Sequence, residues 1–139
     1  MIELDNRTSL EVDEFFLNTI ADTLTNKEIE LLVTNNQEMQ EINLSQRGID
    51  KSTDVLSFPY DEMPMVPLGS IVISYEYVIQ KAQEFGHSNN DEFFLLFIHG
   101  LLHLLGYDHE VDNGEMRRYE EKLIKQFKLP SSLIVRTQG

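Results

Sequence analysis

Three of the four histidines in the chain lie within eleven residues, in the segment HGLLHLLGYDH from His99 to His109. His99 and His103 are four residues apart, so on a helix their rings project from the same face, one turn apart. Gly106 lies where such a helix should end, because glycine readily adopts the left-handed conformation that a reversing chain needs. A turn at this glycine can return His109 to the face that carries the other two rings. The spacing therefore predicts that three imidazoles meet at one place.

Three neutral imidazoles are a ligand set for Zn²⁺, and a catalytic zinc ion keeps its fourth position open for water or substrate. Nickel or copper would also bind such a set. Hydrogen-bonded core histidines are the alternative, but burying three rings without a partner is costly. A structural site would instead be closed by a fourth protein ligand, for which Asp108, Glu110 and His87 are the alternatives. We expect His87, in a predicted loop, to be exposed.

The same histidine spacing is found in the metzincin peptidases. In those enzymes a glutamate follows the first histidine and acts as general base on the zinc-bound water. Here that position is Gly100, which has no side chain. The sequence keeps the metal-binding spacing but lacks the peptidase base, which disfavours peptide hydrolysis by that route. A glutamate introduced at position 100 would test how near the two chemistries lie.

The elements that must position the histidines are those of one α+β domain, a small mixed β-sheet packed with several helices around a central buried helix. The helix that carries the first two histidines is apolar on all sides, which is typical of a buried helix. Asn90 is its expected N-cap, and Thr8 or Ser9 caps the first helix. No repeat or linker divides residues 1–139, and we expect the tail after about residue 129 to be mobile. The predicted helices are 9–21, 36–46, 75–85, 91–105 and 114–127, and the predicted strands are 28–34, 54–58 and 69–74.

The composition is that of a soluble globular protein, with 41% hydrophobic and 25% charged residues. The absence of cysteine excludes a disulfide framework, a thiolate zinc site and a cysteine nucleophile. The first ten residues lack the basic and apolar regions of a signal peptide, and no apolar stretch is long enough to span a bilayer. We therefore expect a cytoplasmic protein without a membrane partner.

The net charge is −13, from 11 basic and 24 acidic residues, and on charge alone it argues against nucleic acid as a partner. The basic residues concentrate near the last predicted helix, where Arg118, Lys122 and Lys125 share one face. This basic strip would suit RNA phosphate, but a solvated helix face with pairs such as Glu121–Lys125 is the favoured interpretation.

The segment from His99 to His109 resembles the signature of the YbeY family, bacterial metal-dependent endoribonucleases of ribosomal RNA maturation. Three further stretches are similar to the same family, and together the similarity spans most of residues 30 to 128. One position departs from the family pattern, because Ser70 stands where an aspartate is usual, which removes a carboxylate expected near the site. The three stretches are Asn43-x-x-x-Arg47, STDVLSFP at 52–59 and LGSIVIS at 68–74.

The resemblance implies that His99, His103 and His109 bind one Zn²⁺ per chain and that Arg47 lines the cleft and contacts RNA phosphate. His99 and Arg47 are the catalytic residues expected on this basis. A guanidinium suits the role because its planar donors match phosphate oxygens, although Arg47 also fits a plain surface position at a helix end. The implied activity is zinc-dependent, single-strand-type endoribonuclease action in 16S ribosomal RNA processing. The implied partners are the rRNA precursor, the small ribosomal subunit and its assembly factors, and not DNA.

Several points stay open in the sequence. Asp108, Glu110 or an outer-shell water are alternatives for the general base, and attack by the RNA 2′-hydroxyl is not excluded. A metallopeptidase-like hydrolase and a non-catalytic, zinc-containing ribosome-assembly protein are the alternative functions. The strand 53–58 is either an edge strand that guides substrate or a plain sheet strand, and Thr53 or Asp54 is expected to brace it.

Overall fold

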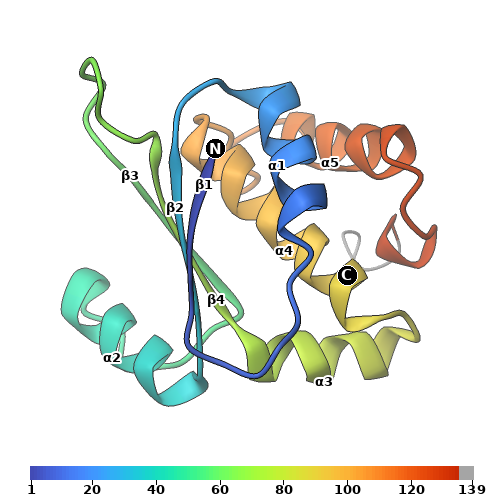
Figure 1. Cartoon of the computed structure of the whole chain (residues 1–139), viewed down its shortest axis with the longest axis horizontal. Coiled ribbons are helices and arrows are strands. Elements are labelled where there is room, and N and C mark those ends of the chain that lie inside the picture. Colours follow the sequence, from blue (N-terminus) through green and yellow to red (C-terminus); the bar gives the residue numbers. More distant parts are fainter. Residues whose placement is uncertain (135–139) are drawn as a thin grey trace.

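A computed structural model describes residues 1–134 and contains a four-stranded sheet with helices on both faces (Figure 1). The strand order is β1-β2-β4-β3, with β3 antiparallel to β4 at one edge and the other pairs parallel. This arrangement confirms the predicted α+β class with a mixed sheet. In chain order the elements are β1 (Ile2–Asn6), α1 (Glu14–Leu24), β2 (Ile29–Thr34), α2 (Asn36–Arg47), β3 (Val55–Pro59), β4 (Gly69–Ser74), α3 (Tyr75–Phe85), α4 (Asn89–Leu104) and α5 (Glu115–Gln126).

Alternation along the strands separates two cores. Ile71 and Ile73 of β4 are fully buried in the main core, which is built against α4 and includes residues of α1, α3 and α5. Val72, between them, points to the other face and packs with Met39 of α2 and Leu56 of β3. Figure 1 shows α2 on one side of the sheet and the other labelled helices on the opposite side. The sheet therefore lies between α2 and the helix that carries His99 and His103.

The central helix α4 is buried along most of its length, from Glu92 to Leu104. Burying each large apolar side chain stabilises the fold by about 1.5–3 kcal/mol, so this helix contributes a large share of the core. Its N-cap is Ser88, whose hydroxyl accepts a hydrogen bond from Asp91 N at 3.1 Å. The prediction of Asn90 as cap was wrong by two residues, because Asn90 already lies inside the first turn.

Two predictions near the N-terminus need correction. The first helix begins at Glu14, where Asp13 caps it by accepting from Phe16 N, and not at residue 9. The hydroxyl of Thr8 instead accepts from Leu10 N, which holds the preceding segment in a local turn. Strand β1 was not predicted at all, since its five residues are short for a periodicity signal and its pairing with β2 stabilises it.

His87 is not the exposed loop residue that we expected. Only 2% of its side chain is accessible, and its Nε2 lies 2.9 Å from Glu92 Oε1. Its Nδ1 hydrogen-bonds to Ser132 Oγ at 3.2 Å. Leu133, in the expected mobile tail, is fully buried, and it packs in a cluster with Leu95 of α4. The rest of that tail, 135–139, lies outside the described residues.

Within residues 1–134, no helix is both long and apolar enough to cross a membrane.

Candidate functional site

The structure brings His99, His103 and His109 together beside the C-terminal half of α4. The Nε2 atoms of His99 and His103 lie 3.2 Å apart. The ring of His109 has its centroid 5.3 Å from that of His99 and 5.6 Å from that of His103. One ligand atom from each residue can be chosen so that all three lie within 4.8 Å of one another. We call these three residues the histidine cluster.

The turn after α4 returns His109 to the helix face. Gly106 adopts φ +100°, and its N–H donates to His103 O at 3.0 Å. Tyr107 N then donates to Leu102 O at 3.0 Å, which satisfies a carbonyl left open at the helix end. A side chain at this φ would be strained, so glycine is the suitable residue at this position. The predicted reversal at Gly106 is confirmed.

Each helical histidine of the cluster also forms a hydrogen bond outside the cluster. The Nδ1–H of His99 donates to Oε1 of Glu120 at 2.6 Å. His103 forms a hydrogen bond to the Tyr107 backbone. These contacts leave the two Nε2 atoms facing each other, as ligands of one ion require.

Sequence analysis missed Glu120, which is 21 residues from His99 and lies on a different helix. The hydrophobic pattern of α5 could have revealed Glu120 as a buried, functional carboxylate. Glu120 occupies the same face as the buried residues Met116, Leu123 and Ile124. A carboxylate on the apolar face of an amphipathic helix is unusual, because burying an ionised group without a partner is costly.

The pKa of His103 is lowered from its ordinary value, mainly by burial and next by the proximity of His99. The hydrogen bond at Tyr107 and the charge of Asp108 oppose this shift, while His109 adds to it. A lowered pKa means that the imidazole stays neutral at more acidic pH. At neutral pH the Nε2 lone pair is therefore available for a metal ion.

The cluster fits a zinc ion. Two imidazole nitrogens bound at about 2.0–2.1 Å in tetrahedral geometry lie about 3.3 Å apart, close to the 3.2 Å between His99 and His103. In the described part of the chain, Asp108, Glu110 and His87 do not belong to the group of mutually close ligand atoms. Asp108 Oδ1 accepts from Glu110 N in the turn, and His87 contacts Glu92. Among residues 1–134 the donor set is therefore three imidazoles with no fourth protein ligand, which is typical of a catalytic rather than a structural metal site.

Gly100, where a peptidase carries its glutamate, faces the sheet at close range. A Cβ atom there would lie 3.0 Å from Cγ2 of Ile71, 3.1 Å from Oγ of Ser57 and 3.3 Å from Cγ2 of Val55. The Ser57 hydroxyl also donates to the Gly100 carbonyl at 3.0 Å. Helix α4 thus lies directly against β3 and β4 at this point. A side chain at position 100 would crowd these neighbours, so the glutamate base of a peptidase has little room there.

The structure does not bring Arg47 into contact with the histidine cluster. Arg47 is the last residue of α2, on the opposite face of the sheet from α4, and it is exposed. Among the described residues it forms no hydrogen bond or ion pair with the cluster. Asn43, one turn earlier, is buried and donates to Lys51 O at 2.9 Å, which anchors the loop after Arg47.

We expected position 70 to be near the site, but Ser70 does not lie beside the histidine cluster. It alternates with the core residue Ile71 on β4, so it faces away from α4 and lines an open hollow on the other side of the sheet. An aspartate at this position would therefore not have been a neighbour of the three imidazoles.

The edge position of β3 is confirmed, and Asp54 Oδ1 braces the start of this strand by accepting from Val55 N.

The basic strip of α5 points away from the core. Arg118, Lys122 and Lys125 are exposed on the side opposite the buried face of the helix. Arg118 donates to Asn113 O, and Lys122 lies over the ring of Tyr119, 5.7 Å from its centroid. Their exposure on this side of α5 agrees with a solvated helix face.

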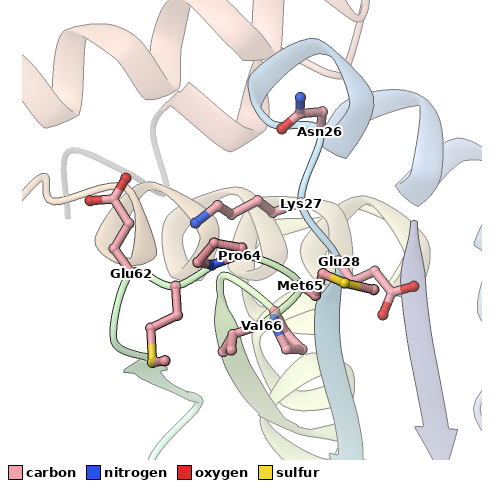
Figure 2. A pocket seen from close by; sticks show the side chains of 9 residues that line it. Asn26, Lys27, Glu28, Glu62, Pro64, Met65 and Val66 are labelled. Carbon is pink, nitrogen blue, oxygen red and sulfur yellow. The ribbon is translucent and has the colours of Figure 1, made fainter.

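A hollow of about 690 Å³ lies between the loop before β2 and the β3–β4 connection. Figure 2 shows Lys27, Glu62, Pro64 and Met65 around it. No histidine lines this hollow, so it is separate from the cluster.

The chain is similar along its whole length to known proteins. The family model described as Endoribonuclease YbeY matches residues 3–128. A protein of Sulfurimonas denitrificans named Endoribonuclease YbeY is 66% identical over 139 residues, covering 100% of both chains. A Helicobacter pylori protein of the same name is 53% identical, covering 99% of both chains. A solution structure of a Thermotoga maritima protein superposes with a TM-score of 0.63 at 27% identity, covering 91% of this chain and 89% of that one. The length of these matches and the three converging histidines lead to one conclusion: the chain belongs to the YbeY family of endoribonucleases.

Proposed function

We propose that this protein is a zinc-dependent endoribonuclease that cleaves single-stranded regions of ribosomal RNA precursors, with His99, His103 and His109 as the metal ligands. The observation that carries the proposal is the convergence of three imidazoles without a fourth protein ligand among the described residues. The name that the full-length relatives share supports RNA as the substrate.

The chain's own residues prepare the site for this chemistry. A bound Zn²⁺ supplies a Lewis acid for the phosphate and a water of low pKa. His99 and His103 present their Nε2 atoms from a rigid, buried helix, so the site is assembled before substrate arrives. Asp108 and Glu110 flank His109 and are the two carboxylates from which a proton acceptor would come. The packing at Gly100 leaves little room for the glutamate base of a peptidase.

Recruitment of RNA needs help, because a net charge of −13 repels a polyanion at long range. The basic strip lies on the solvent side of α5, opposite the face that carries Glu120 and its contact with His99. We propose that the small ribosomal subunit and its assembly factors deliver the 16S precursor, and that the protein works in the cytoplasm, where that assembly takes place.

Metal removal tests the proposal most directly. Protein stripped by a chelator is expected to cleave a single-stranded rRNA precursor at background rate, and one equivalent of Zn²⁺ should restore cleavage. Zinc at 100 times its Kd should also stabilise the fold by about 2.7 kcal/mol, visible as a higher Tm. Magnesium alone is the control, since imidazoles bind it poorly. Cleavage that persists in the stripped protein would show that the histidine cluster is not the catalytic centre.

Arg47 is the residue for which we propose contact with RNA phosphate. It is exposed at the end of α2, across the sheet from the cluster, so its contact is with an RNA strand that extends around the edge at β3. Arg47→Ala is expected to weaken cleavage about 10- to 150-fold, which corresponds to the loss of 1.5–3 kcal/mol for a charged hydrogen bond. Zinc affinity should be unchanged, and Lys51→Ala in the next loop is the charge-matched control. An unaltered cleavage rate would assign Arg47 to the plain surface role.

A further inference from the structure

We infer that Glu120 is a positioning residue of the metal centre, which sets the tautomer and orientation of His99 so that Nε2 faces the ion. The inference rests on the proposed metal site and adds a residue from α5, outside the HGLLHLLGYDH segment. It follows from the contact between Glu120 and His99 and from the burial of the carboxylate.

The contact is short and sheltered. Glu120 Oε1 lies 2.6 Å from Nδ1 of His99, which is at the short end for a charge-assisted hydrogen bond. The side chain of Glu120 is 6% exposed, whereas that of His99 is 29% exposed. In the described part of the chain, His99 is the one hydrogen-bond partner of this carboxylate. Water therefore competes little for the bond, and its direction is well determined.

The bond decides which nitrogen of His99 faces the ion. A carboxylate is an acceptor only, so Nδ1 must carry the proton and Nε2 keeps its lone pair. That Nε2 is the atom 3.2 Å from Nε2 of His103, which is itself held through Tyr107. Without Glu120, His99 would be free to populate the other tautomer, with a proton in the position that the metal must occupy.

The carboxylate also contributes charge. Its negative charge increases the electron donation of the imidazole and partly neutralises a dication bound beyond it. Outer partners of this kind typically change metal affinity 10- to 100-fold. A mere tether between α4 and α5 would act differently, since its loss would lower the Tm of the metal-free protein and leave zinc affinity unchanged.

The test is zinc affinity, measured by competition with a chromophoric chelator on the full chain. Glu120→Ala is expected to weaken zinc binding 10- to 100-fold. Glu120→Gln, which keeps an oxygen acceptor and loses the charge, should fall between Glu120→Ala and the unmodified protein. Glu121→Gln is the matched control, because it removes a neighbouring charge from the same helix, and it should bind zinc normally. Circular dichroism checks folding, and Glu120→Gln carries the test if Glu120→Ala does not fold.

A second readout is independent of metal. The ring nitrogens of His99, observed by NMR in the metal-free protein, should show Nδ1 protonated in the unmodified chain and a mixture of tautomers in Glu120→Ala. A mixture is also expected in Glu120→Gln, because the amide can accept from a protonated Nδ1 through its oxygen or donate to an unprotonated Nδ1 through its NH2 group. Equal zinc affinity in the unmodified and Glu120 variants, or an unchanged tautomer, would overturn the inference. Failure of the unmodified protein to bind zinc would overturn the proposed function instead. The NMR measurement would then still show whether Glu120 sets the tautomer of His99.

Discussion

His103→Ala is expected to reduce single-turnover cleavage of a small-subunit rRNA precursor to background, a loss of at least about 10³-fold. A factor of 10³ corresponds to about 4 kcal/mol of transition-state stabilisation, within what a metal ion supplies. His103 is the residue whose Nε2 lies 3.2 Å from that of His99, and its loss leaves two imidazoles that do not retain zinc. The measurement compares both proteins purified identically and incubated with the same zinc concentration.

The control for this experiment is His87→Gln. It removes the histidine that lies outside the cluster, where it contacts Glu92 and Ser132, and it should cleave normally if it folds. Equal cleavage by the unmodified protein and His103→Ala would point to a contaminating ribonuclease or to a different site. No cleavage by any of the three would favour an assembly role, or a partner that the isolated protein lacks.

Gly100→Glu is expected to destabilise the protein by more than about 3 kcal/mol and to create no peptidase. Forcing extra atoms into packed space costs about 1–3 kcal/mol, and an ionised carboxylate buried without a partner adds to that. The Cβ alone would already approach Ile71 and Ser57 to 3.0 and 3.1 Å. Urea unfolding measures the first effect and hydrolysis of a casein substrate the second.

Gly100→Ala separates the two contributions, because it introduces the Cβ without the charge. We expect it to lie between the unmodified protein and Gly100→Glu, because a gain of about 1 kcal/mol in helix propensity over glycine offsets part of the packing cost of about 1–3 kcal/mol. A Gly100→Glu protein of normal stability would show that α4 can move away from β3. Peptidase activity in that protein would show that the metzincin base can be restored on this fold.

Local signals in the sequence were sufficient for the core of the site. The spacing of His99 and His103 places two rings on one helix face by helical geometry alone. Gly106 indicates where the chain reverses, because the turn needs a residue with positive φ and glycine adopts that conformation most readily. The apolar run around the histidines predicts a buried helix, and α4 is buried from Glu92 to Leu104 except at His99 and His103. Short-range geometry carries all three predictions.

The features that the sequence did not predict depend on contacts between residues far apart in the chain. Glu120 reaches His99 across the packing of α5 on α4, and His87 is buried by Ser132, 45 residues away. Strand β1 depends on its pairing with β2. No local pattern states which residues will be brought together from distant parts of the chain. The sequence by itself therefore determined which three imidazoles meet. Only the tertiary structure decided what holds the ring of His99, why position 100 has no room for a base, and that Arg47 lies across the sheet, because each depends on how separate elements pack.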